Sequence, residues 1–219
     1  MERCFIFDAY NTWTDWGLIL TKKTDITPPE IKTNYVDITG MSGSIDLTEA
    51  LSGEPTFEDR TFSADFCAVD GSYEERKKLL DSIISAIHGR KIKIIEPDDA
   101  DHYFYGRVKI KNVTHAVPIS EFTAECICDP WRYECREIVH TISVSSQTPV
   151  DVMIHNRGRK TVCPDIEILG QVMVTCCGVT SQATTGKYKI TTFKLYQGEN
   201  VIKVSGSGTL TLTYRRADL

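Results

Sequence analysis

A single segment of this chain has a helical period, and the runs on both sides of it have the texture of short strands. From Tyr73 to His88, apolar residues recur every three or four positions, which predicts an amphipathic helix. Ser72 and Glu75 form a capping-box pair at its start, and Gly89 supplies a left-handed stop. The apolar stripe consists of Leu79, Leu80, Ile83, Ile84 and Ile87. The opposite face is charged or polar, so we expect the helix to lie across a sheet.

The rest of the first half reads as strands. Runs rich in alternating, β-branched or aromatic residues predict strands over 61–68, 91–95, 103–110 and 121–128, the last closed by Asp129-Pro130. Within the first of these, Phe62, Ala64 and Phe66 are expected to face the core. Residues 35–47 carry a turn signal from Gly40 to Gly43 between two β-type runs, which predicts a hairpin.

From residue 138 onward no helical period is found. Strand-length runs alternate with turn residues and predict a β-sandwich of about 80 residues. The runs are 138–144, 149–154, 165–169, 171–176, 187–196, 200–204 and 209–214, with breaks that include Gly170, Gly178 and Gly206-Ser207-Gly208. The predicted fold class is therefore mainly β with one helix, in two domains, 1–137 and 138–219.

The charge divides along the same line. Residues 1–136 hold 16 basic and 24 acidic residues, a net −8, and residues 137–219 hold 9 and 6, a net +3, which sum to the −5 of the chain. A net acidic chain with a pI near 5.6 lacks the basic footprint of a nucleic-acid binder. The chain has no run of about 20 apolar residues and no signal-peptide pattern at its start, so we expect neither membrane insertion nor classical secretion.

The eight cysteines are expected to be thiols that behave as small buried hydrophobes, because nothing in the sequence points to an oxidising compartment. Cys126 and Cys128 would share one face of a strand. Adjacent Cys176 and Cys177 would point to opposite faces of a strand, which suits neither a shared ligand set nor a mutual disulfide.

No phosphate-binding, zinc-protease or nucleophile-elbow motif is present. The densest polar cluster runs from Glu96 to His102. Its spacing does not match a calcium loop, and Pro97-Asp98-Asp99 reads as a turn between two strands. A metal-dependent hydrolase that uses Asp98, Asp99, Asp101 and His102 is a weaker alternative. A carbohydrate-binding module is another, although the predicted sandwich has no tryptophan to stack on a sugar.

In their order along the chain, these pieces resemble the distal tail proteins of long, non-contractile-tailed bacteriophages. The resemblance covers essentially the whole sequence. Its motifs are the hairpin region Tyr35–Gly53, Phe57-Glu-Asp-Arg60, the helix ending Ile87-His88-Gly89-Arg90, Pro97-Asp98-Asp99, Tyr103-Phe-Tyr-Gly-Arg107, Cys126-Ile-Cys-Asp-Pro130 and the tail from Gly198 to Arg215. The resemblance implies a galectin-like sandwich in the second domain.

The resemblance also implies a function. Such proteins form a six-membered ring at the tail tip of the virion, which joins the tail tube protein to the tail-tip hub and to host-recognition proteins, with an opening for passing DNA. No catalytic, cofactor or metal site is implied. Positions that could pair within the domain or across subunits are Asp46, Arg60, Asp98, Asp99 and Arg107. Carboxylates of the acidic first domain could line the opening and repel DNA phosphates.

Overall fold

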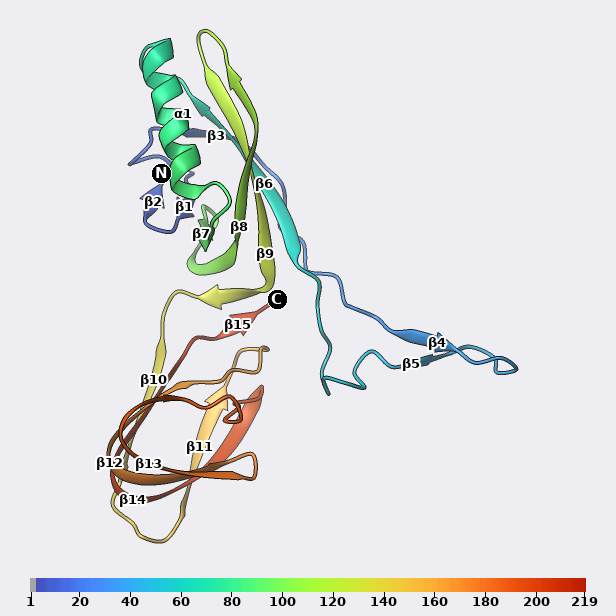
Figure 1. The fold of residues 1–219 in the computed structure, drawn as a ribbon, viewed down its shortest axis with the longest axis vertical. Coiled ribbons are helices and arrows are strands. Elements are labelled where there is room, and N and C mark those ends of the chain that lie inside the picture. The colour runs from blue at the N-terminus through green and yellow to red at the C-terminus, as the bar shows by residue number, and fades with distance from the viewer. Residues whose placement is uncertain (1–2) are drawn as a thin grey trace. The chain divides into compact units, whose positions relative to one another are not determined.

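A computed structural model describes residues 3–219, which divide into two compact units, 3–132 with 219, and 133–218. The boundary suggested by the sequence, at 137/138, falls between β9 and β10, inside the second unit. Among the described residues, no helix has the length and apolar character required to cross a bilayer. The chain is mainly β with one helix, as predicted (Figure 1).

The first unit is built on a sheet whose main path runs β2-β1-β7-β8-β9-β6-β3. All the ladders recorded along this path are antiparallel. The strands are β1 (Ile6–Phe7), β2 (Tyr10–Asn11), β3 (Ile19–Lys23), β6 (Arg60–Ala68), β7 (Lys91–Glu96), β8 (Asp99–His115) and β9 (Ser120–Glu134). Phe62, Ala64 and Phe66 point into the core, as predicted. Pro97-Asp98 is the turn between β7 and β8.

Helix α1 (Tyr73–Ile87) begins and ends where its caps require. Ser72 is the N-cap, the capping box with Glu75 is formed, and Gly89 has a φ of +75°. Leu80, Ile83 and Ile87 are buried in the same apolar cluster as Phe62 and Phe66, so the helix covers one face of the sheet (Figure 1).

The prediction that Asp129-Pro130 closes a strand is wrong, because β9 continues to Glu134. The ladder between β6 and β9 ends at the pair Arg60–Cys128, so Pro130 lies past the last position where this ladder needs an N–H donor. The Pro130 carbonyl instead accepts a hydrogen bond from the Arg60 guanidinium at 2.5 Å.

The second unit holds a curled sheet of order β10-β14-β12-β13, with β11 also paired to β14. The five strands of this sheet are β10 (Ile138–Val144), β11 (Val150–Asn156), β12 (Asp165–Cys176), β13 (Val179–Lys189) and β14 (Gly198–Tyr214). A short last strand, β15 (Ala217–Asp218), pairs with β9 instead. The first part of β14 pairs with β11 and the last part pairs with β10, so this one long strand belongs to both halves of the curled sheet. The two halves share a core that includes Ile154, Ile202 and Leu210.

Two sets of predicted strand ends are wrong in this unit. Gly170 and Gly206–Gly208 bend continuous strands instead of ending them. Gly170 faces Gly208 in the ladder, and a Cβ on Gly208 would lie 2.1 Å from the Leu169 carbonyl oxygen. Only glycine allows the two backbones to approach this closely. The run 187–196 is likewise not one strand, because β13 spans 179–189 and the chain then turns.

Candidate functional site

Residues 24–59 leave the main sheet of the first unit as an extended arm, which carries its own two-stranded sheet (Figure 1). The predicted hairpin is confirmed, with β4 (Tyr35–Asp37) paired to β5 (Ser44–Asp46). An isolated bridge between Ile31 and Phe57 joins the two sides of the arm nearer the sheet. Neither β4 nor β5 pairs with any other described strand.

The hairpin has two unlike faces, because side chains alternate along a strand. Val36 lies opposite Ile45 in the ladder, and Ile38 and Leu47 follow at two-residue steps, directly after the ends of β4 and β5. We call these four side chains the apolar face of the arm. Each of them is between 38% and 47% exposed. A cluster of large apolar side chains left in water is typical of a surface that another molecule covers.

The opposite face, which we call the acidic face, carries Tyr35, Asp37 and Asp46. Together with the returning chain, it borders a pocket of about 700 Å³, lined also by Glu49 and Pro55. The Asp46 carboxylate accepts a hydrogen bond from the Thr48 backbone N–H at 2.9 Å. Hydrogen bonds from Thr48 hold the pKa of Asp46 below its usual range, so this carboxylate stays charged.

The arm holds nearly all the net charge of the first domain. Between residues 24 and 59 there is one base, Lys32, against eight acids, a net −7. The rest of residues 1–136 then has 15 bases and 16 acids, a net −1. The eight acids are Asp25, Glu30, Asp37, Asp46, Glu49, Glu54, Glu58 and Asp59.

The acidic cluster after β7 is held in ion pairs. Asp98 contacts Arg3 at 2.6 Å and Lys23 at 2.9 Å, and hydrogen bonds from Lys23 and then Arg3 lower its pKa. Asp99 accepts from the His102 Nδ1 at 2.8 Å and lies 3.1 Å from Arg132. Over residues 3–219, no group of three or more His, Cys, Asp and Glu side chains is arranged to hold a metal ion. Asp98 and Asp99 therefore fix the β7–β8 turn to its surroundings.

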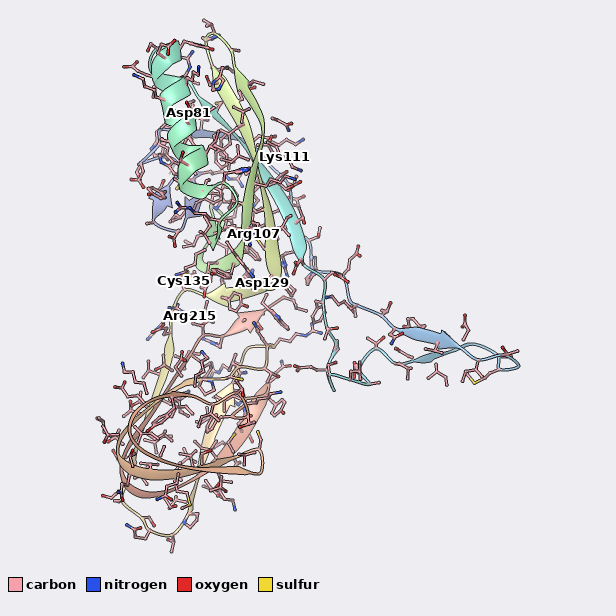
Figure 2. The ribbon with its side chains drawn as sticks, in the orientation of Figure 1. Asp81, Arg107, Lys111, Asp129, Cys135 and Arg215 are labelled. Atoms are coloured by element: carbon pink, nitrogen blue, oxygen red, sulfur yellow. The ribbon has the colours of Figure 1, made fainter. Side chains whose placement is uncertain are left out.

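The two predicted arginines have different environments. Arg60 is buried, with its guanidinium 5.2 Å from the centre of the Phe104 ring, and burial lowers its pKa. Its Nε finds no hydrogen-bond partner among the described residues. Arg107 is exposed on β8 and donates to the Gly89 carbonyl at the end of α1 (Figure 2). Thus Arg60 belongs to the interior of its unit, while Arg107 lies on its surface.

The prediction for the adjacent cysteines is wrong. Cys176 ends β12, but Cys177 lies in the turn before β13, with a φ of +51°, and is followed by Gly178 at +77°. This two-residue turn brings the Cys176 and Cys177 sulfurs to 3.5 Å from each other. Burial raises the pKa of the Cys176 thiol to about 12. The sequence did hold a signal for this. Gly178 directly after Cys177 is typical of a two-residue turn, which indicates that Cys177 is a turn residue and not a strand residue.

The prediction that all the cysteines are buried is confirmed for four of them, Cys67, Cys126, Cys128 and Cys176. It is wrong for the other four, since Cys177 is exposed and Cys4, Cys135 and Cys163 are half-buried. Cys126 and Cys128 share the inner face of β9 and are fully buried, as expected. A Cβ on Gly106, in the adjoining β8, would lie 2.3 Å from the Cys128 sulfur. Packing against Cys128 thus requires a glycine at position 106.

A second pocket, of about 420 Å³, lies in the second unit. Its charged side chains face one another across the β12–β13 ladder, with Lys189 at 2.8 Å from Asp165 and Lys187 at 3.8 Å from Glu167. Tyr188 is the one aromatic residue that lines it, and its hydroxyl donates to the Thr184 carbonyl. This lining gives no specific support to a sugar site.

The sequence predicted the hairpin but not the four apolar residues that matter most on it. One signal was available in the sequence. Apolar residues stand two positions apart on each side of the turn, at Val36 and Ile38 before it and at Ile45 and Leu47 after it. The sequence does not show that these four side chains are left uncovered, because their exposure depends on where the arm leaves the sheet.

No protein-family model matches this sequence, and no curated protein matches it either. Seven solved chains match the structure. One is the crystal structure of Dit (gp 19.1) of phage SPP1, described as a paradigm of the hub adsorption apparatus in phages that infect Gram-positive bacteria. The TM-score is 0.67 at 15% sequence identity, over 98% of this chain and 99% of that one. The resemblance to distal tail proteins is therefore confirmed at the level of the fold: the chain has the fold of SPP1 Dit over nearly its whole length.

Proposed function

We propose that this chain is a structural component of a phage or prophage tail tip, and not an enzyme. Six copies form a ring that joins the tail tube protein to the tail-tip hub and the host-recognition proteins. DNA passes through its opening. The protein is made and assembled in the host cytoplasm and ends in the virion tail. The shared fold with SPP1 Dit supports this reading, since that protein is described as part of a hub adsorption apparatus.

The observation that carries the proposal is the uncovered apolar face of the arm. A two-stranded hairpin on its own is at best marginally stable in water, and it needs a further strand or a packing partner. The apolar face is exposed and β4 and β5 pair only with each other among the described strands. A second copy of the chain is the partner we propose. Arm and body are different surfaces, so the contact is heterologous and can close into a ring.

The size of the contact favours a ring over a pair. Burying the exposed parts of Val36, Ile38, Ile45 and Leu47 would contribute about 3–4 kcal/mol. The surface that the arm covers adds a similar amount, but association itself costs at least about 4 kcal/mol. The net falls short of the about 8 kcal/mol that a dissociation constant of 1 µM needs, so one arm contact alone is too weak for a stable dimer. In a closed ring each copy makes two such contacts, and both must break before it leaves.

We propose that the carboxylates that line the opening and repel DNA phosphates belong to the arm. Because the arm holds a net −7 and the rest of the first domain only −1, arms that line the opening would place the repelling carboxylates there. Rings with all the arms at the outer rim would contradict this part of the proposal.

The test compares the native chain with two variants of one hairpin. Ile45→Asp places a charge on the apolar face, and Ser44→Asp places the same charge one residue away on the acidic face. We expect six-fold rings in negative-stain images and a six-copy mass in solution for the native chain and for Ser44→Asp. Ile45→Asp should remain a monomer.

Two results would oppose this. Rings of Ile45→Asp would mean that the apolar face is not the contact. A native chain that stays monomeric at high concentration, and also in the presence of purified tail tubes, would contradict ring formation itself.

A further inference from the structure

The turn between β12 and β13 brings three ligand atoms together. The sulfurs of Cys176 and Cys177 are 3.5 Å apart. The Lys194 carbonyl oxygen lies 3.5 Å from the first sulfur and 3.4 Å from the second, and both thiols donate to it. The three atoms thus form a nearly equilateral triangle. Two of its corners are the soft donors that thiophilic ions prefer.

The dimensions of this triangle match one face of a tetrahedral metal site. In zinc sites the metal–sulfur distance is about 2.3 Å and the metal–oxygen distance about 2.1 Å. In a regular tetrahedron these lengths separate two sulfurs by about 3.8 Å, and a sulfur from an oxygen by about 3.6 Å. The observed separations are within a few tenths of an ångström of both values. An ion could therefore bind all three atoms with only small shifts.

The backbone at this turn supports a specific role for Cys177. A two-residue turn with positive φ at both positions favours Asn-Gly, and a cysteine at the first position is strained there by about 1 kcal/mol. Cys177 has that conformation, and it is this that turns its sulfur toward Cys176 instead of away from it. Turn formation alone gives no reason for a cysteine.

The site is also accessible. Cys177 is exposed, while Cys176 is buried at the end of β12. An ion could enter from the Cys177 side and keep a water as its fourth ligand, as open zinc sites do. Lys194 belongs to the segment between β13 and β14, so a bound ion would link that segment to the turn.

We propose that Cys176, Cys177 and the Lys194 carbonyl oxygen form a binding site for one thiophilic divalent ion of the zinc class. Binding replaces the two S–H donors by two metal–sulfur bonds and releases two protons to solvent. The oxidation states of sulfur and metal do not change. The site rests on the geometry of the second unit and does not depend on ring formation.

Cd²⁺ is the probe, because its bonds to thiolates give an ultraviolet charge-transfer band. The full chain, reduced and free of metal, is titrated with Cd²⁺ while the band is recorded, and the mass of the complex is measured under native conditions. We expect one ion per chain. Cys177→Ser, in an exposed turn, should lose both the band and the bound ion.

The matched control is Cys163→Ser. Cys163 lies in the same unit, and its thiol donates to a different carbonyl, that of Thr191, at 3.6 Å. This variant should bind Cd²⁺ as the native chain does. A second readout covers any folding defect: bound Cd²⁺ should protect Cys177 of the native chain from alkylation and leave Cys163 reactive. No bound ion in the native chain, or unchanged binding in Cys177→Ser, would overturn the proposal.

Discussion

At the scale of single residues, the first turn of α1 shows how a local motif decides a boundary. The Ser72 backbone N–H donates to the Glu75 carboxylate at 2.7 Å, and the Ser72 hydroxyl accepts from the Glu75 backbone N–H at 3.3 Å. This reciprocal pair satisfies two donors that the helix start would leave unpaired. Such a motif depends only on residues three apart, which is why the sequence alone was enough to place the helix.

The Ser72–Glu75 pair should also make the stability of the protein depend on pH. Hydrogen bonds from the Ser72 backbone, and then from its side chain, lower the pKa of Glu75 below its usual 4.5. A lowered folded-state pKa stabilises the protein above pH 4.5, and the contribution is lost as the pH falls through the folded-state value. Glu75→Gln should therefore reduce the free energy of unfolding at pH 7 but not at pH 3, as measured by urea denaturation.

Glu74→Gln is the control for that experiment. It removes a charge from the same helix turn but no capping hydrogen bond, so its effect at pH 7 should be smaller. A loss for Glu75→Gln that is equal at both pH values would show that the charged state of Glu75 contributes nothing.

At the scale of elements, the strands of the second unit show what sequence patterns miss. The curled sheet depends on Gly170, Gly206 and Gly208, where β12 and β14 bend while their ladder continues. In a sequence, a glycine that bends a strand and one that ends it look alike. The difference lies in the neighbouring backbone, such as the Leu169 carbonyl oxygen close to Gly208, and that contact is between residues far apart in the chain.

Gly208→Ala tests this reading of the bend. The new Cβ would lie 2.1 Å from the Leu169 oxygen, and residue 208 has a φ of +155°. Overpacking and strain together should lower the free energy of unfolding by about 3 kcal/mol or more. Ser207→Ala, at the next position, should change it by less than about 0.5 kcal/mol. Denaturant titration of both variants decides the matter, and equal stabilities would show that β14 does not need a glycine there.

At the scale of the whole molecule, the sequence predicted the fold better than it predicted the site. Helix, hairpin and sandwich follow from periods and turn residues, which are local. The site residues suggested by the sequence were less informative, because Asp98 and Asp99 form ion pairs within their own unit and Arg60 is buried. The apolar face of the arm and the Cys176–Cys177 pair depend on what lies nearby in space. No spacing rule could identify them.

The charge of the arm has a consequence for the protein before it assembles. An exposed two-stranded hairpin offers free strand edges, and free edges tend to join into aggregates. With a net −7 on each arm, two free copies repel each other at this place. Salt near 1 M shortens the screening length to about 3 Å and should remove this protection. Light scattering should then show irregular association of the native chain that is absent at low salt. The carboxylates of the arm would thus keep the arms of free copies from joining one another before each arm binds the body of another copy in the ring.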